Sequence, residues 1–434
     1  MRFKGTALLA AALVGIISYY FLIDLPSEKR KNKEKDRAEK VILFDPENVK
    51  GISFTKGEVT ITLKGLGIDE WQMTAPVNAK GDALAVSEFL SFLSNLNFTR
   101  VVEESSKDLS PFGLDTPGLR IILSMNNGET KGVRVGDDHP MGNKVYLALL
   151  KGSQVLAAGV TKNRLDRSAH DLRDKTILDF KTPLIKKIEF IRNGKTLNLI
   201  KDKESWQVLE NRISAKGNET EITNLLNKIQ AAQIEQFVEE NSKQLTFYGL
   251  NNPKLTVKLT TLKSKEPLTL LVGNKNEHGF YAKTLLKKNV FTIGQSLFDS
   301  LNNREFVHFL NKSLVDFNDN DVIKMTLRMD NVTVDLIRNK KDLQEWTMQQ
   351  PIEMKANTST INSVLFDLKN TRIVEFVSTQ AKNSEVFNFE QSEKEINLTY
   401  KSGETWALKL NKKTSNPDHY LAQRTDEEAF FTLQ

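Results

Sequence analysis

The fold of this chain is decided by a stretch that occurs in three versions, the clearest being residues 205–229, SWQVLENRISAKGNETEITNLLNKI. The stretch starts with a tryptophan in an alternating run. It continues into Asn218, which is followed by apolar residues at offsets of four, eight and eleven. An asparagine in front of that spacing is typical of an N-capped amphipathic helix with one buried stripe. The stretch therefore predicts a strand followed by a helix that packs on it.

The same pattern recurs at a spacing of about 135 to 140 residues. The matched positions are Trp71, Trp206 and Trp346 for the tryptophan, Asp82, Asn218 and Asn357 for the helix cap, and Val86, Ile222, Ile361, Leu90, Leu226, Leu365, Leu93, Ile229 and Leu368 for the stripe. Short alternating runs and then a tyrosine (Tyr146, Tyr281 or Tyr420) follow each helix, which predicts further strands. Solenoid repeats have periods of about 20 to 50 residues, so this longer period indicates tandem domains with separate cores.

We therefore expect an α+β fold: an N-terminal single transmembrane helix, then three tandem copies of a strand-helix-strand domain with antiparallel sheets. The expected boundaries are residues 1–25 for the anchor, 26–43 for a charged juxtamembrane linker, and 44–180, 181–317 and 318–434 for the three repeat domains. The first two copies end in a similar closing segment, residues 173–180 and 310–317, which the third copy lacks. Either the third copy needs no such segment, or this chain is shorter than its parent.

The expected anchor is residues 5–23, GTALLAAALVGIISYYFLI, a run without any charged residue. A run of this length is enough to cross a hydrocarbon layer about 30 Å thick. A cleaved signal peptide is the alternative, but its apolar region is normally about 7 to 15 residues long and ends in a small-x-small site. Because this run ends in Tyr19-Tyr20-Phe21-Leu22-Ile23, we predict an uncleaved span that contacts membrane lipid.

The orientation of this span is predicted from the charges beside it and from the length of the chain after it. Basic residues lie on both sides, and the larger cluster, within residues 29–40, would favour a cytoplasmic body. Long downstream domains often translocate regardless of loop charge. We therefore expect a single-pass protein of the bacterial inner membrane whose body is extracytoplasmic or periplasmic.

The search for reactive groups predicts no catalytic, cofactor-binding or metal-binding residues, no cofactor and no enzymatic activity. Gly194-Lys195-Thr196 resembles the end of a phosphate loop, but Glu189 stands where the first glycine of that loop is required, so we interpret it as a hairpin turn. Asp137-Asp138-His139 is the one cluster that resembles a site, and we interpret it as a loop. We expect the recurring tryptophans to be core residues rather than stacking platforms for a ligand.

Composition narrows the possible partners and the possible chemistry. The chain has 61 Lys and Arg residues against 55 Asp and Glu residues, a net charge of +6, which is too balanced to indicate a nucleic-acid partner. It contains no cysteine, which excludes disulfides, thiol chemistry and attachment through a lipidated N-terminal cysteine.

The chain resembles the bacterial domain-of-unknown-function family numbered 4340. The resemblance rests on residues 49–54, Trp71-Gln72-Met73-Thr74-Ala75-Pro76, the helix from Asp82 to about Phe98, Phe112-Gly113-Leu114 and Val133-Arg134-Val135-Gly136. It covers about residues 40 to 320 well and the remainder more loosely. It implies a membrane-anchored envelope protein that accompanies ABC-type transporters related to the gliding-motility system, and it implies no activity.

Two hypotheses remain for the function. In the first, the protein is a non-enzymatic accessory subunit of an ABC-type export or gliding transporter, bound to its permease and ATPase complex, and the tandem domains bind protein or substrate. In the second, it is an extracytoplasmic enzyme or binding protein that acts on cell-wall or polysaccharide material. The first is favoured, because an enzyme would concentrate acid and base residues in one cleft, whereas the polar residues here differ between copies.

Overall fold

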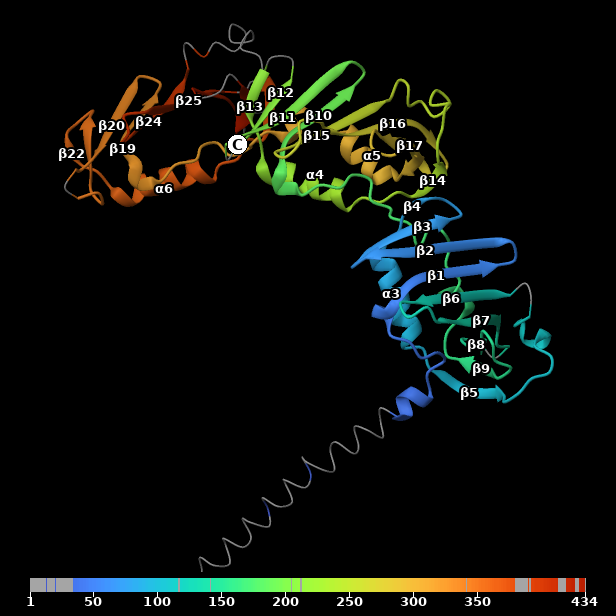
Figure 1. Ribbon diagram of the computed structural model, residues 1–434. Helices are drawn as coiled ribbons and strands as arrows, with labels where there is room; N and C mark the ends of the chain where they lie inside the picture. Colours follow the sequence, from blue (N-terminus) through green and yellow to red (C-terminus); the bar gives the residue numbers. More distant parts are fainter. Residues whose placement is uncertain are drawn as a thin grey trace, which may run out of the picture. The chain divides into compact units, whose positions relative to one another are not determined.

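The computed structural model describes residues 34–115, 118–140, 142–203, 205–210, 213–340, 342–378, 392–412, 419–425 and 429–433, and the single residues Leu13, Tyr20 and Phe389. The chain divides into two compact units, residues 1–175 and 176–434. The first unit contains one nine-stranded antiparallel sheet, and the second contains two (Figure 1). These sheets confirm the predicted α+β fold built from tandem antiparallel domains.

In the first sheet the strand order is β4-β3-β2-β1-β6-β7-β8-β9-β5. The chain starts at β1 in the middle of the sheet, runs outward to β4, and crosses through helix α3 to β5 at the opposite edge. It then returns to the middle at β6, beside β1, and runs outward again to β9, beside β5. The elements are η2 (Pro46–Asn48), β1 (Val49–Lys56), β2 (Val59–Gly67), β3 (Glu70–Ala75), β4 (Ala79–Lys80), α3 (Ala83–Ser94), β5 (Phe98–Glu103), η3 (Ser110–Phe112), β6 (Leu119–Met125), β7 (Thr130–Asp138), β8 (Val145–Leu149), β9 (Val155–Ala158) and η4 (Lys162–Arg164).

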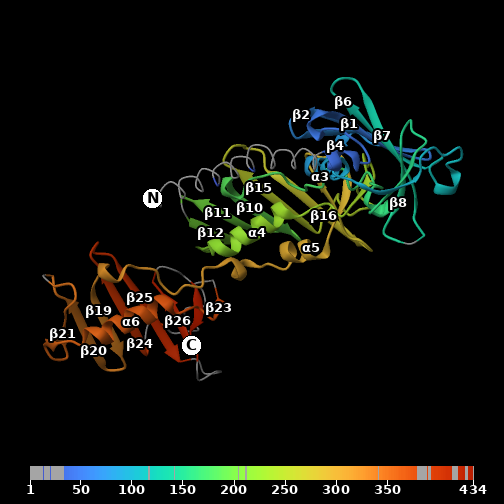
Figure 2. The same cartoon turned by 90° about the horizontal axis from the view of Figure 1, so that it is seen from below.

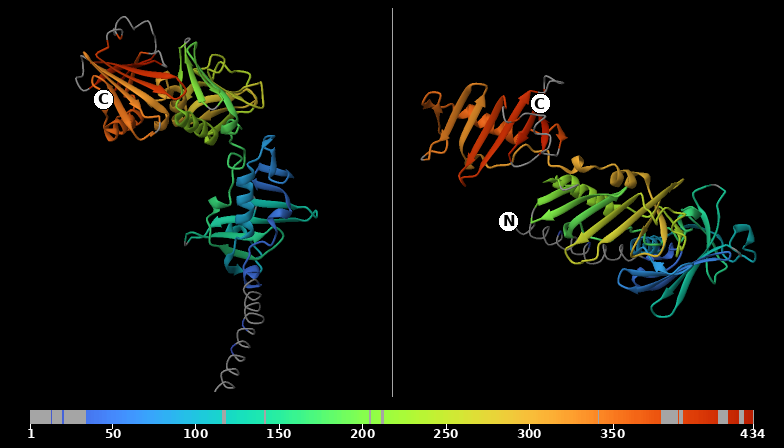
Figure 3. Two further views of the ribbon diagram at one scale, coloured as in Figure 1. Left: turned by 90° about the vertical axis from the view of Figure 1, so that its left-hand side faces the viewer. Right: turned by 90° about the horizontal axis from the view of Figure 1, so that it is seen from above.

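The second and third sheets repeat this order strand for strand. The second consists of η5 (Thr182–Leu184), β10 (Ile185–Arg192), β11 (Lys195–Asp202), β12 (Ser205–Glu210), β13 (Ile213–Lys216), α4 (Glu219–Ala231), β14 (Gln236–Glu239), β15 (Leu255–Thr261), β16 (Leu268–Asn276), β17 (Gly279–Thr284), β18 (Val290–Ile293), α5 (Gln295–Asn302) and η6 (Phe306–Phe309). The third consists of η7 (Asp319–Asp321), β19 (Val322–Met329), β20 (Val332–Arg338), β21 (Trp346–Gln350), β22 (Met354–Lys355), α6 (Thr358–Asn370), β23 (Glu375–Ser378), β24 (Lys394–Tyr400), β25 (Thr405–Lys412), β26 (Tyr420–Arg424) and β27 (Phe430–Leu433). Figure 3 gives two further views of these strands.

The three predicted helices form with the predicted caps and the predicted buried stripe. Asp82, Asn218 and Asn357 each accept a hydrogen bond from the backbone N–H three residues on, at 3.0, 3.2 and 3.2 Å. The stripe residues of all three helices are buried. The predicted hairpin forms at Gly194-Lys195-Thr196: Asn193 and Gly194, both at positive φ, make the turn, and Lys195 begins β11 opposite Arg192.

One helix is too small to cover a nine-stranded sheet. Eight gaps of about 4.8 Å make such a sheet about 38 Å wide, whereas the 12 residues of α3 span about 18 Å even if they lie straight across the strands. The remaining apolar face needs other chain segments to cover it. In the second sheet α5 supplies part of that cover, and Figure 2 shows it beside α4.

The recurring tryptophans belong to the cores, as predicted. Trp206 and Trp346 are 3% and 0% exposed, and Trp71 is half-buried against the core of the first sheet. Trp206 shares its cluster with the α4 stripe, including Ile222 and Leu226. The ligand-platform interpretation is therefore not needed for these rings.

A smaller cluster lies on the opposite face of each sheet, under the turn that follows the helix. There Phe112 packs on Tyr146 with ring centroids 5.1 Å apart, and Tyr248 packs on Tyr281 at 4.8 Å. The matching of Tyr420 to these tyrosines was wrong by one residue. Strand pairing places Leu421 at that position, because Leu421 pairs with Thr432 as Tyr281 pairs with Thr292.

The predicted anchor, residues 5–23, lies outside the described residues except for Leu13 and Tyr20. Within the part of the chain that the structure describes, no helix combines the length and apolar character needed to span a membrane. Of the predicted linker, residues 34–38 are helical. Its end belongs to the first sheet, because Lys40 forms a bridge with Asn97, and Val41 and Ile42 are buried in the core.

The predicted domain boundaries after residues 180 and 317 stay predictions, but packing favours positions a few residues earlier. Ile177, Leu178 and Phe180 are buried in the core of the second sheet, and Leu314 is buried in the core of the third. The second and third sheets also lie within one compact unit rather than two.

Replacing Trp206 by Ala should destabilise the second sheet. Truncating a buried aromatic residue commonly costs about 3 to 5 kcal/mol, and this ring lies against Val208 and the α4 stripe. We expect faster hydrogen exchange of residues 219–231 in mild denaturant. Trp71→Ala is the matched control, and its cost should be smaller because that ring is only partly buried. Wild-type exchange in the Trp206→Ala variant together with loss of a ligand would instead support a stacking platform.

Candidate functional site

The cluster at Asp137, Asp138 and His139 holds neighbouring loops in place. The Asp138 carboxylate accepts a hydrogen bond from the backbone N–H of Lys162 at 2.7 Å, and the Asp137 carboxylate pairs with the Lys162 ammonium at 3.1 Å. A Cβ at Gly113 would lie 2.5 Å from Oδ2 of Asp137, so this acid packs directly on the turn. Asp137 and Asp138 are the last two residues of β7 and only His139 lies beyond it, so the cluster stands at a strand end rather than in a loop.

Asn274 and Lys412 occupy the position of Asp137 in the other two copies, so the acid itself is not shared, but the structure shows a shared contact in the first two sheets. In the second sheet Asn274 packs in the same way on Gly249, where a Cβ would lie 2.7 Å from Oδ1. Its Nδ2 also donates to the carbonyl of Phe247 at 3.3 Å. The preceding glycine marks this close approach, because a Cβ at Gly273 would lie 2.0 Å from the carbonyl oxygen of Tyr248.

A stronger candidate for a binding site is the edge of each sheet at the start of its helix. In the first sheet residues 172–174 lie along this edge in antiparallel alignment with residues 80–82. Gly81 forms a bridge with Arg173, and the backbone N–H of Asp82 donates to the carbonyl of Leu172 at 2.9 Å. The N–H of Asp174 donates to the carbonyl of Lys80 at 3.0 Å. We call residues 172–174 the edge segment of the first sheet.

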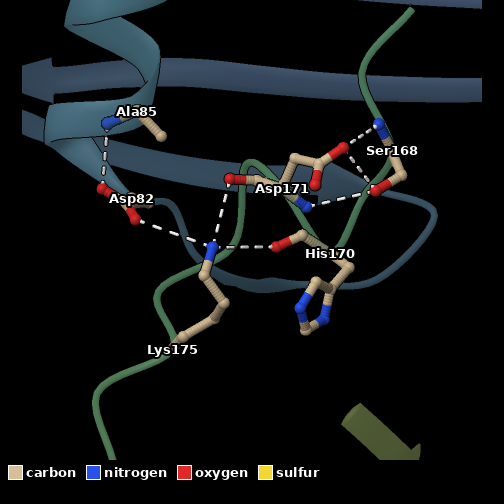
Figure 4. Close-up of polar contacts among 6 residues, drawn as sticks. All are labelled: Asp82, Ala85, Ser168, His170, Asp171 and Lys175. Atoms are coloured by element: carbon tan, nitrogen blue, oxygen red, sulfur yellow. Dashed lines mark hydrogen bonds and ion pairs between the residues drawn. The ribbon is translucent and has the colours of Figure 1, made fainter. Parts of the chain in front are cut away.

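Polar side chains fasten this edge segment to the helix (Figure 4). The Lys175 ammonium lies 3.2 and 3.3 Å from the carbonyl oxygens of His170 and Asp171, and 3.8 Å from the capping carboxylate of Asp82. The Asp171 carboxylate accepts hydrogen bonds from the backbone and hydroxyl of Ser168, at 2.8 and 2.7 Å. The helix cap and the segment before the edge are therefore tied together.

These hydrogen bonds change the pKa of Asp171. Partial burial raises the pKa, but the backbone and hydroxyl hydrogen bonds from Ser168, with smaller effects of Arg167 and His170, bring it below the ordinary value of 3.8. The carboxylate is thus the favoured form in the folded chain.

Acid should loosen the edge segment of the first sheet. A carboxyl group with a lowered folded pKa contributes stability that is present above its unfolded value of 3.8 and is lost as the pH falls through the lower folded value. We expect hydrogen exchange of residues 168–175, corrected for the intrinsic rate, to quicken in that window. Asp171→Asn should remove much of this dependence. An unchanged pH profile in that variant would contradict the assignment.

The second sheet has an edge segment of the same kind, residues 309–311. Gly217 forms a bridge with Leu310, and the N–H of Asn218 donates to the carbonyl of Phe309 at 2.7 Å. The N–H of Asn311 donates to the carbonyl of Lys216 at 2.9 Å. The two edges thus use the same three backbone contacts.

The third sheet has the same edge without an edge segment among the described residues. The N–H of Ala356 donates to the carbonyl of Trp346 at 2.9 Å, just as Gly81 and Gly217 donate to their tryptophans at 2.7 Å. The next N–H, that of Asn357, has no hydrogen-bond partner in the described part of the chain, whereas Asp82 and Asn218 have one. The edge beside β22 is therefore open.

Two hollows are candidates for small-ligand sites. One, of about 720 Å³, lies along α3 and is lined by residues such as Ser91, Phe92 and Asn95. The other, of about 610 Å³, lies in the second unit and is lined by residues of β13, β25 and β26. Trp406 lines the second hollow and is 5% exposed, and its indole N–H has no hydrogen-bond partner among the residues that the structure describes. Neither hollow shows a set of contacts repeated between sheets, as the sheet edges do.

The described part of the chain shows no cluster suited to a metal ion. No three His, Asp or Glu side chains there are grouped so that they could hold a metal ion. His308 is used structurally, because its Nδ1 accepts a hydrogen bond from the backbone N–H of Glu305 at 2.9 Å.

The fold and its edges define a tandem-repeat α+β protein in which extended segments complete the sheets. The model of the family described as "Domain of unknown function (DUF4340)" matches residues 71–244 and 206–392. The two matches together cover well over half of the 434 residues, so the chain belongs to this family. The matches begin at Trp71 and Trp206, the same position in two successive sheets.

Other comparisons add no functional information. No curated protein matches the sequence. Two solved structures of the Pseudomonas aeruginosa DNA polymerase sliding clamp align at 8% and 7% identity, with TM-scores of 0.15 and 0.13. The first alignment covers 92% of this chain and 94% of the clamp, and the second covers 90% and 92%. Such low TM-scores carry no argument about fold or function.

Proposed function

We propose that this protein is a non-enzymatic, membrane-anchored, extracytoplasmic accessory subunit of an ABC-type transporter of the gliding or export kind. The observation that supports this proposal best is that the residues recurring at matched positions have structural roles. They cap helices, fill cores and pair sheet edges, and none of them forms a shared reactive group. Repetition of a scaffold without repetition of chemistry favours a binding role.

The anchor and the partner in this proposal come from the sequence and from the family resemblance. Residues 5–23 are long and apolar enough for one span that contacts lipid and docks beside a permease and its ATPase. Tandem domains on one anchor favour weak multiple contacts, because a tethered second contact acts at an effective concentration that reaches about millimolar for short flexible linkers.

Deleting residues 1–25 should release the protein from membranes and abolish its co-purification with the permease and ATPase. Confinement to the membrane plane raises the local concentration of a weak partner, and the deleted chain loses this confinement. The measurement is membrane fractionation followed by affinity purification in mild detergent, with the full chain as control. Complex formation by the deleted chain at the wild-type level would contradict the role of the anchor in docking.

Replacing Asp137, Asp138 and His139 together by Ala should leave assembly and transport intact. Asp137 and Asp138 hold a turn and the start of η4, and the His139 ring lies 5.2 Å from that of Tyr146, so we expect a lower melting temperature without loss of the complex. Transport assays and co-purification measure the two properties separately. Loss of activity in a fully assembled complex would favour the alternative of an enzyme that acts on cell-wall or polysaccharide material.

A further inference from the structure

The first two sheets have a cover that extends from the edge segment back over the helix side of the sheet. In the first sheet this cover is residues 164–172, with Leu165 and Leu172 buried in the core and the Arg167 guanidinium 5.5 Å from the ring of Phe89. In the second it is residues 295–309, where Phe309 stacks on Phe190 with centroids 5.9 Å apart. Each cover therefore buries apolar side chains of both strand and helix.

The third sheet has no such cover among its described residues, and side chains at matched positions are only partly buried there. Strand pairing and helix offset identify four positions that are buried in the first two sheets and partly exposed in the third. They are Phe54, Phe190 and Leu327; Ile61, Leu197 and Val334; Met73, Val208 and Met348; and Phe89, Leu225 and Val364. We call Leu327, Val334, Met348 and Val364 the third groove.

The first hairpin of each sheet, beside the groove, also presents a more apolar surface in the third sheet than in the first two. In the first sheet Lys56 of the β1–β2 hairpin pairs with Asp166 of the cover at 2.5 Å, and in the second Arg192 donates to the carbonyl of Leu301 at 2.9 Å. The third sheet places Met329, which is 48% exposed, at the position of Lys56 and Arg192. A polar tie to a cover is thus replaced by apolar surface.

We propose that the third groove binds an extended segment of a partner protein, which adds as a strand beside β22 and lays an apolar side chain into the groove. The two edge segments define its chemistry, since both read as an apolar residue, any residue, then Asp or Asn: Leu172-Arg173-Asp174 and Phe309-Leu310-Asn311. This is strand addition to a sheet edge, in which backbone bonds supply affinity and side-chain pockets supply specificity.

The charge at the edge is complementary to such a segment. Lys80 on the first edge lies 3.7 Å from Asp174 of its edge segment. Lys355 occupies the matched position on the third edge, with its side chain 74% exposed and its ammonium 2.6 Å from Glu345. We expect its ammonium to exchange Glu345 for an incoming carboxylate, because Lys80 lies near Asp174 at the matched position.

A second copy of this chain is the less suitable occupant. Both edge segments of a copy are hydrogen-bonded to their own sheets, so donating one would open the sheet that it leaves. The inference rests on the groove and the edge alone, and it holds whether or not the partner belongs to a transporter.

The test uses the full chain and a synthetic peptide of residues 304–313, REFVHFLNKS, which contains the edge segment of the second sheet. Hydrogen exchange of residues 354–360 should be fast in the free protein and should slow severalfold as peptide is added. The corresponding stretches 79–85 and 215–221 should not change, because their capping N–H groups are already bonded. A peptide with Phe309→Ala and Asn311→Pro should give no protection.

Two variants separate the groove from the edge. Leu327→Lys should weaken peptide binding at least about tenfold, equivalent to about 1.4 kcal/mol. Lys355→Glu should weaken binding of a peptide with Asp at position 311 about threefold, as expected for an exposed ion pair. Lys216→Glu, on the edge already filled, is the matched control and should bind normally.

Three results would overturn the proposal. One is a folded full chain in which saturating peptide leaves exchange of residues 354–360 unchanged. Another is binding that Leu327→Lys and Lys355→Glu both leave intact in folded protein. The third is a free chain that is already dimeric and protected at residues 354–360, which would make a second copy the occupant.

Discussion

The apolar width of a nine-stranded sheet is the constraint on which the rest of this structure depends. A helix of 12 or 13 residues covers only part of such a sheet. The strands nevertheless carry buried residues far beyond it, such as Val133 and Leu147 in the first sheet. Lead-in residues, helix, edge segment and cover must together exclude water from one face. The recurring residues are those that this arrangement needs.

The chain meets this constraint by using one short run for two sheets. The N–H of Asp174 still bonds to the first edge, whereas Thr176, two residues on, bridges to Gln233 of the second sheet. Asn311 and Ser313 divide their contacts in the same way between Lys216 and Arg372. The segment predicted to close one domain therefore also opens the next. A cut on either side of it would remove a strand from one sheet or core residues from the other.

The sequence was sufficient for features whose cause is local. A helix cap and the buried apolar stripe behind it lie within about a dozen consecutive residues. The positions of Asp82, Asn218 and Asn357 and of their helices were therefore predicted directly. The face of the sheet on which a strand residue lies was harder to predict from the sequence. Tyr420 and Leu421 are neighbours in sequence but lie on opposite faces, and only strand pairing distinguishes them. The shared role of Asp137 and Asn274 was hidden because it depends on close contact with a distant turn rather than on residue type.

The open third edge becomes visible only in the folded chain. There the third groove contributes more to the binding free energy of an occupant than backbone hydrogen bonds do. A net hydrogen bond contributes only about 0.5 to 1.5 kcal/mol, and β22 offers few of them. Its shortness and its lysine also limit unspecific pairing, as edge strands in native sheets commonly do. Burial of apolar surface, at about 25 cal/mol per Å², must therefore supply most of the affinity of any occupant. Met329 stands where the other two sheets form polar ties to their covers. A more apolar segment than either cover consequently fits this sheet best, and that difference favours a foreign segment over a copy of the chain's own.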